Sequence, residues 1–225
     1  MMRAGCPKVL VYLAGLLALF ASPRSALADN TEIREFSVII DGKDAGTSRM
    51  TIVSKDDGSA YFTATVDVKF RHIILDYSIK LETQEWWKNG RLVGLKTTGS
   101  DNGKKVDLTI AADNNGLRLR VNGKDTQIRP DVWTTSYWKL ADARFHNKQV
   151  PIIEADSGKE YNCELKFVGN EKIKVGADLQ DCYHFRVAAA PGPVELWFDR
   201  YHRLVRAEFT EAGHKTIVQL INVKR

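Results

Sequence analysis

The chain has 225 residues, of which 44% are hydrophobic and 27% charged, with 33 Lys and Arg against 28 Asp and Glu and a formal net charge of +5. This composition excludes a disordered chain and a collagen-like one, and it allows one large domain or two small ones. Whether the basic excess points to nucleic acid depends on where the charges lie.

The first 28 residues have the layout of a secretory signal peptide. Arg3 and Lys8 precede an uncharged run of 13 residues, 9–21, and small side chains stand at Ala26 and Ala28, the −3 and −1 positions of a cleavage site. A retained anchor is the alternative, but a membrane span needs about 20 apolar residues. We therefore expect cleavage after Ala28, no transmembrane anchor in the mature protein, and a periplasmic or secreted location.

Loss of the leader changes the charge balance, because residues 1–28 contain three of the 33 basic residues and no acidic one, which leaves 30 against 28. The densest basic run is then Lys104-Lys105, beside Asp101 and Asp107. Proteins that bind single-stranded nucleic acid combine aromatic side chains with a basic groove. We expect no nucleic-acid partner.

Cys163 and Cys182 are the thiols that remain after cleavage, and an exported protein meets an oxidising compartment. We expect them to form a disulfide, which closes a loop of about 20 residues and stabilises the fold by roughly 3 kcal/mol in the chain-entropy model. The alternative is two buried thiols. The five histidines are scattered without the spacing of a zinc site, so we expect no metal and no cofactor.

Most of residues 29–225 alternates between apolar and polar side chains with period two, as in half-buried antiparallel strands. The clearest case is Ser59–Phe70, with Phe62, Val66 and Phe70 on one face. The other alternating segments are Glu35–Asp41, Met50–Lys55, Ile73–Trp87, Val106–Ala111, Leu117–Val121, Tyr161–Val168, Cys182–Ala188, Val194–Phe198, Leu204–Phe209 and Thr216–Val223. The tight turns expected between strands are Asp41-Gly42, Asp57-Gly58, Asn89-Gly90, Asn102-Gly103, Asn115-Gly116, Asn122-Gly123, Gly169-Asn170 and Ala212-Gly213.

One segment, Pro130–Phe145, breaks this pattern, because Val132, Trp133, Tyr137 and Leu140 recur at spacings closer to those of a helix. We expect a short helix or an irregular crossover near 131–145. The prediction is an all-β, mainly antiparallel fold: a curved meander sheet or half-barrel around that crossover. It forms a single domain, 29–225, with sheet halves at about 30–129 and 150–225.

The aromatic residues are the candidates for ligand binding. Trp133, Tyr137, Trp138 and Trp197 cluster near the crossover and a C-terminal hairpin, and large aromatics beside a cleft stack on sugar rings or cover acyl chains. The alternative is that they fill the core. Adjacent strand residues point to opposite faces, so of Trp86 and Trp87 one is expected outside the core.

Catalytic signatures are weak. Gly-x-Ser-x-Gly is absent. Asp76, Glu82 and Glu85 of the long fourth strand are the candidates there for a glycosidase pair. Asp76 and Glu82 share a face with Lys80, however, which is the pattern of a solvated outer face, so we expect no catalytic pair. We assign no catalytic residue. An envelope polysaccharide hydrolase or lyase that uses Asp199, His184 and His202 is the enzymatic alternative.

Three motifs carry a resemblance: Trp133–Trp138 (WTTSYW), Gly169–Val175 leading to Asp181–Phe185, and Leu196–Asp199 followed by Arg203–Val205. Together they resemble a family of uncharacterised exported bacterial β-rich proteins, over roughly residues 32–223. More remotely, the layout is similar to the curved half-barrel of periplasmic lipoprotein carriers. The resemblance implies a fold and no activity.

The expected function is that of an exported, non-enzymatic binding or carrier module for a lipid, acyl or glycan ligand. A structural or interaction protein is a further alternative. The sequence leaves the oligomeric state open.

Overall fold

The computed structural model describes residues 30–72, 75–114, 116–188 and 192–225, so the expected leader and its cleavage site lie outside the described residues. The described part forms one sheet of fifteen strands, antiparallel apart from one short parallel pair, and the predicted all-β fold is confirmed. The strands are β1 Asn30–Ile40, β2 Lys43–Ser54, β3 Ser59–His72, β4 Leu75–Lys88, β5 Arg91–Asp101, β6 Lys104–Asp113, β7 Gly116–Val121, β8 Lys124–Ile128, β9 Trp133–Thr134, β10 Lys148–Ile153, β11 Glu160–Val175, β12 Asp178–Ala188, β13 Val194–Phe198, β14 Leu204–Glu211 and β15 His214–Lys224.

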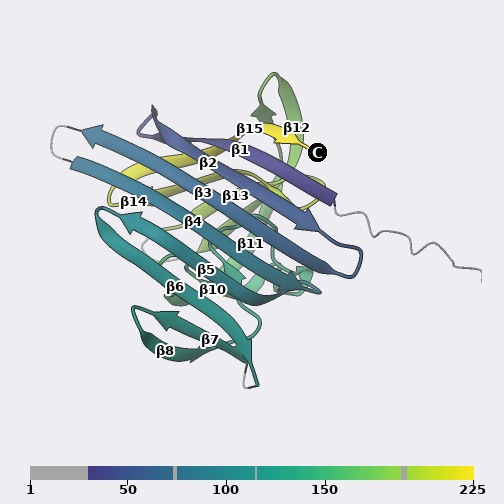
Figure 1. The fold of residues 1–225 in the computed structure, drawn as a ribbon. Coiled ribbons are helices and arrows are strands. Elements are labelled where there is room, and N and C mark those ends of the chain that lie inside the picture. The colour runs from purple at the N-terminus through teal and green to yellow at the C-terminus, as the bar shows by residue number, and fades with distance from the viewer. Residues whose placement is uncertain (1–29, 73–74, 115, 189–191) are drawn as a thin grey trace, which may run out of the picture.

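The sheet consists of two meanders that meet at the ends of the chain. Its order runs from β8 back to β1, then from β15 back to β9, so that β1 pairs with β15 in the middle (Figure 1). Ile33 lies opposite Lys224 at one end of this seam, and Ile40 lies opposite Thr216 at the other. The seam joins the residues of the two expected sheet halves into one sheet.

Several turns follow directly from Asn-Gly and similar pairs. Both residues of Asn89-Gly90 and of Asn102-Gly103 have positive φ, between 48° and 76°, as a type I′ hairpin turn requires. Gly169-Asn170, in contrast, is not a turn. It lies inside β11, beside a register shift between Phe167 and Gly169, and the chain reverses at Gly176 instead.

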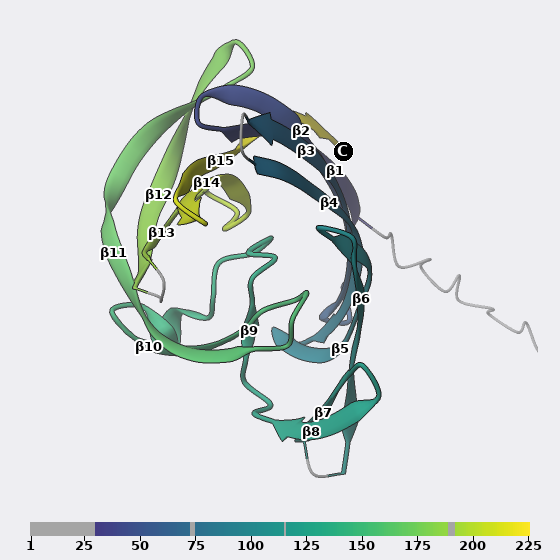
Figure 2. The same cartoon turned by 90° about the vertical axis from the view of Figure 1, so that its left-hand side faces the viewer.

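The crossover from 131 to 145 is irregular, and the helix expected as one possibility there is reduced to a single 3-10 turn at Ala143–Phe145. Its backbone groups are bonded to neighbouring segments and not to carbonyls four residues back: Leu140 N donates to His202 O, and Trp138 O accepts from Leu204 N. Figure 2 shows the sheet curling round so that β9 and the crossover lie inside the curve. Among the described residues, no helix is long and apolar enough to cross a membrane.

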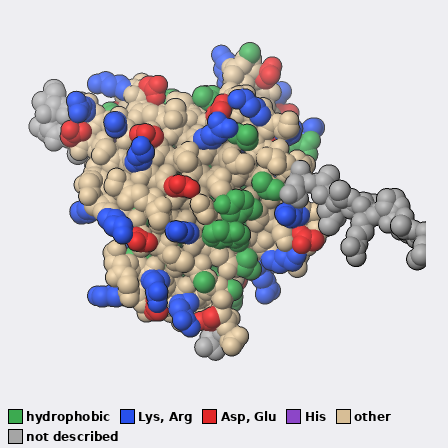
Figure 3. All heavy atoms as spheres, viewed as in Figure 1, with side chains coloured by type: hydrophobic (Ala, Val, Ile, Leu, Met, Phe, Trp, Pro, Cys, Tyr) green, Lys and Arg blue, Asp and Glu red, His purple; other side chains and the backbone are tan. Residues whose placement is uncertain are grey.

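The concave face of the sheet forms the core, with Phe36, Ile52, Phe62 and Leu95 fully buried. The two adjacent tryptophans separate as the strand geometry requires: Trp87 packs inward, whereas Trp86 is 39% exposed. On the face drawn in Figure 3, acidic and basic side chains are interspersed, and hydrophobic side chains gather near the middle.

The expected disulfide between Cys163 and Cys182 is wrong, because both cysteines are free thiols. The β11–β12 register explains this: Cys182 lies opposite Glu171, eight residues along β11 from Cys163. At about 3.3 Å per residue the two positions are roughly 26 Å apart along the strand, far beyond the Cα separation of a disulfide. Burial raises the pKa of Cys182 to about 12, so that thiol is unreactive as well as remote.

Candidate functional site

The crossover brings together three of the four aromatic residues expected at the site. The Trp133 and Tyr137 rings meet edge to face at 4.8 Å, and the Trp138 indole meets that of Trp87 at 6.0 Å. Trp138 also stacks on Phe62 of β3, with 14° between the ring planes. Trp138 therefore holds the crossover against the concave face of β3 and β4.

A pocket of about 150 Å³ opens beside these rings, and we call it the tryptophan pocket. Its walls are Trp87, Trp133 and Trp138, with Ala60 of β3 and the apolar part of the crossover. Arg91, Asp131, Lys139, Asp142 and Arg144 also line it. An apolar surface with polar groups converging on it is the usual character of a small-molecule site.

Glu85 of β4, for which the sequence predicts no catalytic role, is completely buried and bonds to two of the pocket's tryptophans. Its Oε2 accepts hydrogen bonds from the indole nitrogens of Trp87 (2.8 Å) and Trp138 (3.0 Å), while Oε1 has no hydrogen-bond partner. Burial raises the pKa of Glu85, and neighbouring hydrogen-bond donors, the Ser136 hydroxyl foremost and then Trp87, Thr134 and Trp138, act against that shift. One carboxyl group thus fixes the orientation of two pocket walls that come from different elements.

Trp197, the fourth expected aromatic residue, lies elsewhere. It is adjacent to Phe198, which contacts Trp133, so the Trp197 side chain leaves β13 on the opposite face. There it stacks on His184 at 4.3 Å and donates to Glu171. The two ring nitrogens of His184 lie 2.7 Å from oxygens of Glu171 and Glu195, and this geometry holds β11, β12 and β13 together.

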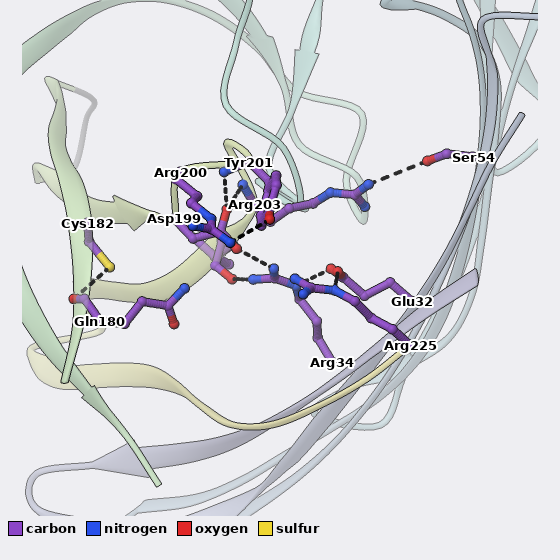
Figure 4. Close-up of polar contacts among 11 residues, drawn as sticks. Glu32, Arg34, Ser54, Gln180, Cys182, Asp199, Arg200, Tyr201, Arg203 and Arg225 are labelled. Atoms are coloured by element: carbon purple, nitrogen blue, oxygen red, sulfur yellow. Dashed lines mark hydrogen bonds and ion pairs between the residues drawn. The ribbon is translucent and has the colours of Figure 1, made fainter. Parts of the chain in front are cut away.

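A buried ion-pair network spans the interior near the seam (Figure 4). Arg34 of β1, 1% exposed, donates to Asp199 Oδ2 at 2.5 Å, to Glu32 Oε1 at 2.6 Å and to the carbonyl of Leu204 at 2.7 Å. The other carboxylate oxygen of Asp199 accepts from the backbone N–H groups of Tyr201 and Arg203. Arg34 thereby ties β1 to the turn between β13 and β14.

Two further arginines complete this network. Arg225 donates to Glu32 at 2.7 Å; burial alone would raise the pKa of Glu32, but hydrogen bonds from Arg225 and Arg34 hold it below its usual value. Arg203 extends over the Trp138 ring, 5.7 Å from its centroid, and reaches Ser54 Oγ at 3.4 Å. Its Nη1 is buried without a hydrogen-bond partner. The network of Arg34, Arg203, Arg225, Glu32 and Asp199 therefore has one more cation than anions.

Two residues of the enzymatic alternative, Asp199 and His184, have side chains occupied by contacts that stabilise the fold. Asp199 binds Arg34 and caps its own turn, and His184 is enclosed by two carboxylates. The His202 backbone bonds to Asp199 and to Leu140. Within the described ranges, no three His, Cys, Asp or Glu side chains are grouped so that they could hold a metal ion.

A second, more open cavity of about 320 Å³ lies on the other side of Leu140, and we call it the aromatic groove. It is lined by Leu140, His146, Asn147, Phe167, Tyr183, Phe185 and His202. Phe167 and Tyr183 are more than a third exposed there. In contrast to the tryptophan pocket, its lining includes no Lys, Arg, Asp or Glu.

Sequence reasoning missed Trp87 and Glu85 as site residues, and Arg34 and Arg203 as buried cations. The sequence does offer one signal for Glu85: alternation along β4 places it on the same face as Trp87. Nothing local marks the arginines, because their partners lie up to 170 residues away.

The geometry defines an all-β, barrel-like protein with a tryptophan-lined pocket. The chain belongs to the family described as a domain of unknown function (DUF6134), which it matches over residues 36–221. Its fold is similar to that of a beta-barrel-like protein of a domain of unknown function, DUF1849, from Brucella abortus, with a TM-score of 0.59 and 9% identity over 88% of this chain and 99% of the other. No curated protein matches.

Proposed function

We propose that this protein is an exported, non-enzymatic binding module whose tryptophan pocket takes one ring of a small ligand, such as a sugar unit of a glycan. The supporting observation is the pocket itself, with Trp87, Trp133 and Trp138 as walls and polar groups around them. A cavity of about 150 Å³ is known to hold benzene. The volume therefore suits a single six-membered ring better than a long acyl chain, and Trp87, the half-buried one of the three tryptophans, has aromatic surface to offer such a ring.

Export is the other half of the proposal and rests on residues 1–28. If the leader is cleaved as expected, protein recovered from the periplasm or medium begins at Asp29. Intact mass measurement of that material tests this. A mass that includes residues 1–28 rejects export by this signal.

Ligand binding is tested by proton–nitrogen NMR of the tryptophan indoles during titration with soluble oligosaccharides and short-chain lipids. We expect the indole signals of Trp87, Trp133 and Trp138 to shift together, because these three form the pocket walls. The signals of Trp86 and Trp197 serve as internal controls and stay in place. If no ligand of either kind moves the three pocket signals, the protein is not a binding module of this kind.

A further inference from the structure

The tryptophan pocket is lined by more cations than anions, and the cations are the more accessible to a ligand. Three cations, Arg91, Lys139 and Arg144, line it with two anions, Asp131 and Asp142. All three cations are exposed, so their charged groups are accessible to a ligand. A ligand at this pocket therefore meets more positive than negative charge.

The two carboxylates are already engaged within the protein. Asp131 accepts both hydrogen bonds of the Arg129 guanidinium, at 3.1 and 3.2 Å. Asp142 Oδ1 accepts from the backbone N–H of Arg144 at 2.9 Å, which caps the 3-10 turn. These contacts reduce the negative charge that the carboxylates present to the pocket.

The three cations are less engaged. Among the described residues, no carboxylate lies within 4.0 Å of the charged groups of Arg91, Lys139 or Arg144, although the charge of Arg144 helps to lower the pKa of Asp131. The Arg144 guanidinium lies over the ring of its neighbour Phe145, 4.6 Å from the centroid. A further cation, Arg203, packs on the ring of Trp138, one of the pocket walls.

We propose that the ligand of the tryptophan pocket is an anionic sugar ring, held by contact with the side chains of Trp87, Trp133 and Trp138 and by ion pairing with Arg91, Lys139 and Arg144. This inference rests on the proposed function and adds its ligand class. The anionic group is a carboxylate, as in a uronate, or a phosphate, as in a sugar phosphate; guanidinium groups match the geometry of both. The rings supply the area of contact, and the three cations supply selectivity for the charged ring over the neutral one.

The test compares three probes by indole NMR at low and at high salt: methyl β-D-glucuronide, glucose 6-phosphate and neutral methyl β-D-glucoside. We expect at least one charged ring to bind about tenfold more tightly than the neutral ring, with the advantage falling as salt rises. Whichever charged probe binds more tightly identifies the uronate or the phosphate as the source.

Substitution of the three cations that line the pocket, which we call the rim variants, tests whether they cause the preference for a charged ring. Arg91→Ala, Lys139→Ala and Arg144→Ala are each expected to weaken charged-ring binding about two- to fivefold more than they weaken neutral-ring binding, as for exposed ion pairs. The control is Lys124→Ala, an exposed lysine of β8 that lines neither cavity.

The outcomes separate the two proposals. Equal affinity for charged and neutral rings, or rim variants that behave like Lys124→Ala, overturns the anionic ligand and leaves the binding module standing. Binding of charged probes that shifts the Trp197 signal and not the pocket signals overturns it as well. If none of the three probes moves any pocket signal, and the oligosaccharides and short-chain lipids of the first titration also move none, the proposed function is rejected together with the anionic ligand.

Discussion

Removal of the Asp199 carboxylate is expected to cause a large loss of stability. In Asp199→Ala, the Arg34 guanidinium stays buried with Glu32 as its remaining carboxylate, and the backbone N–H groups of Tyr201 and Arg203 lose their acceptor. Breaking a buried ion pair costs about 3–5 kcal/mol. Since Glu32 still offsets part of the charge, we expect a loss of about 4 kcal/mol with the two unpaired N–H groups included.

Asp199→Asn separates charge from hydrogen bonding. Its amide oxygen can still accept from the two turn N–H groups, so we expect a smaller loss of roughly 2–3 kcal/mol, mostly from the uncompensated Arg34. Replacement of both partners, as in Arg34→Met with Asp199→Leu, removes both charges of this pair and leaves Glu32 bonded to Arg225. We expect this double variant to be more stable than Asp199→Ala.

Urea unfolding at neutral pH, followed by circular dichroism, measures these differences. For a protein of this size about 4 kcal/mol corresponds to a fall in Tm of roughly 8–16 °C. The matched control is Asp181→Ala, which removes an exposed aspartate 3.9 Å from Lys172 and is expected to cost less than about 1 kcal/mol. If Asp199→Ala costs no more than this control, Arg34 does not depend on the ion pair and the reasoning is refuted.

Three further predictions concern the acid behind the pocket, the thiols and the tryptophans. The pKa of Glu85 is raised, so at pH values just above the usual glutamate pKa the folded protein keeps a proton that the unfolded chain has released. The free energy of unfolding therefore falls as pH rises through this window. The stability of Glu85→Gln relative to wild type should therefore increase with pH through that window; urea midpoints that run parallel would contradict this. Cys163 and Cys182 should resist a thiol reagent in the native protein and both react in urea without reductant, whereas a chain 2 Da lighter would reveal a disulfide. Trp138→Phe should weaken ring binding in the NMR titration, and Trp197→Phe should leave it unchanged.

The strands and turns that sequence reasoning found are those with local causes. Asn89-Gly90 and Asn102-Gly103 supply positive φ at both turn positions, and regular alternation marks β3 and β4. The strand between these turns, β5, escaped because Gly94 and Gly99 interrupt its pattern. Both glycines serve close approach: a Cβ on Gly99 would lie 2.0 Å from the carbonyl oxygen of Lys80 on β4. The glycines that let the neighbouring strand approach β5 also interrupt the alternation of apolar and polar side chains from which strands are predicted.

The site residues were predictable to the extent that they lie together in the chain. Trp133, Tyr137 and Trp138 belong to one short segment, and the structure keeps them together. Glu85 and Trp197 depend on which strand faces which, and pairing across the sheet is not encoded in local spacing. The same reason separates Cys163 from Cys182, whose loop length alone is compatible with a disulfide.

The seam between β1 and β15 has a consequence for how the chain reaches this fold. The first described strand pairs with the last, so this contact joins distant parts of the sequence and cannot form before β15 has been synthesised. Until then β1, an 11-residue strand with regular alternation, has one edge without its partner. Such an edge is a template for association with other chains. The completion of β15 is therefore the step that protects the middle of the sheet, and shortening the C-terminus should promote aggregation more than shortening β8 at the outer edge.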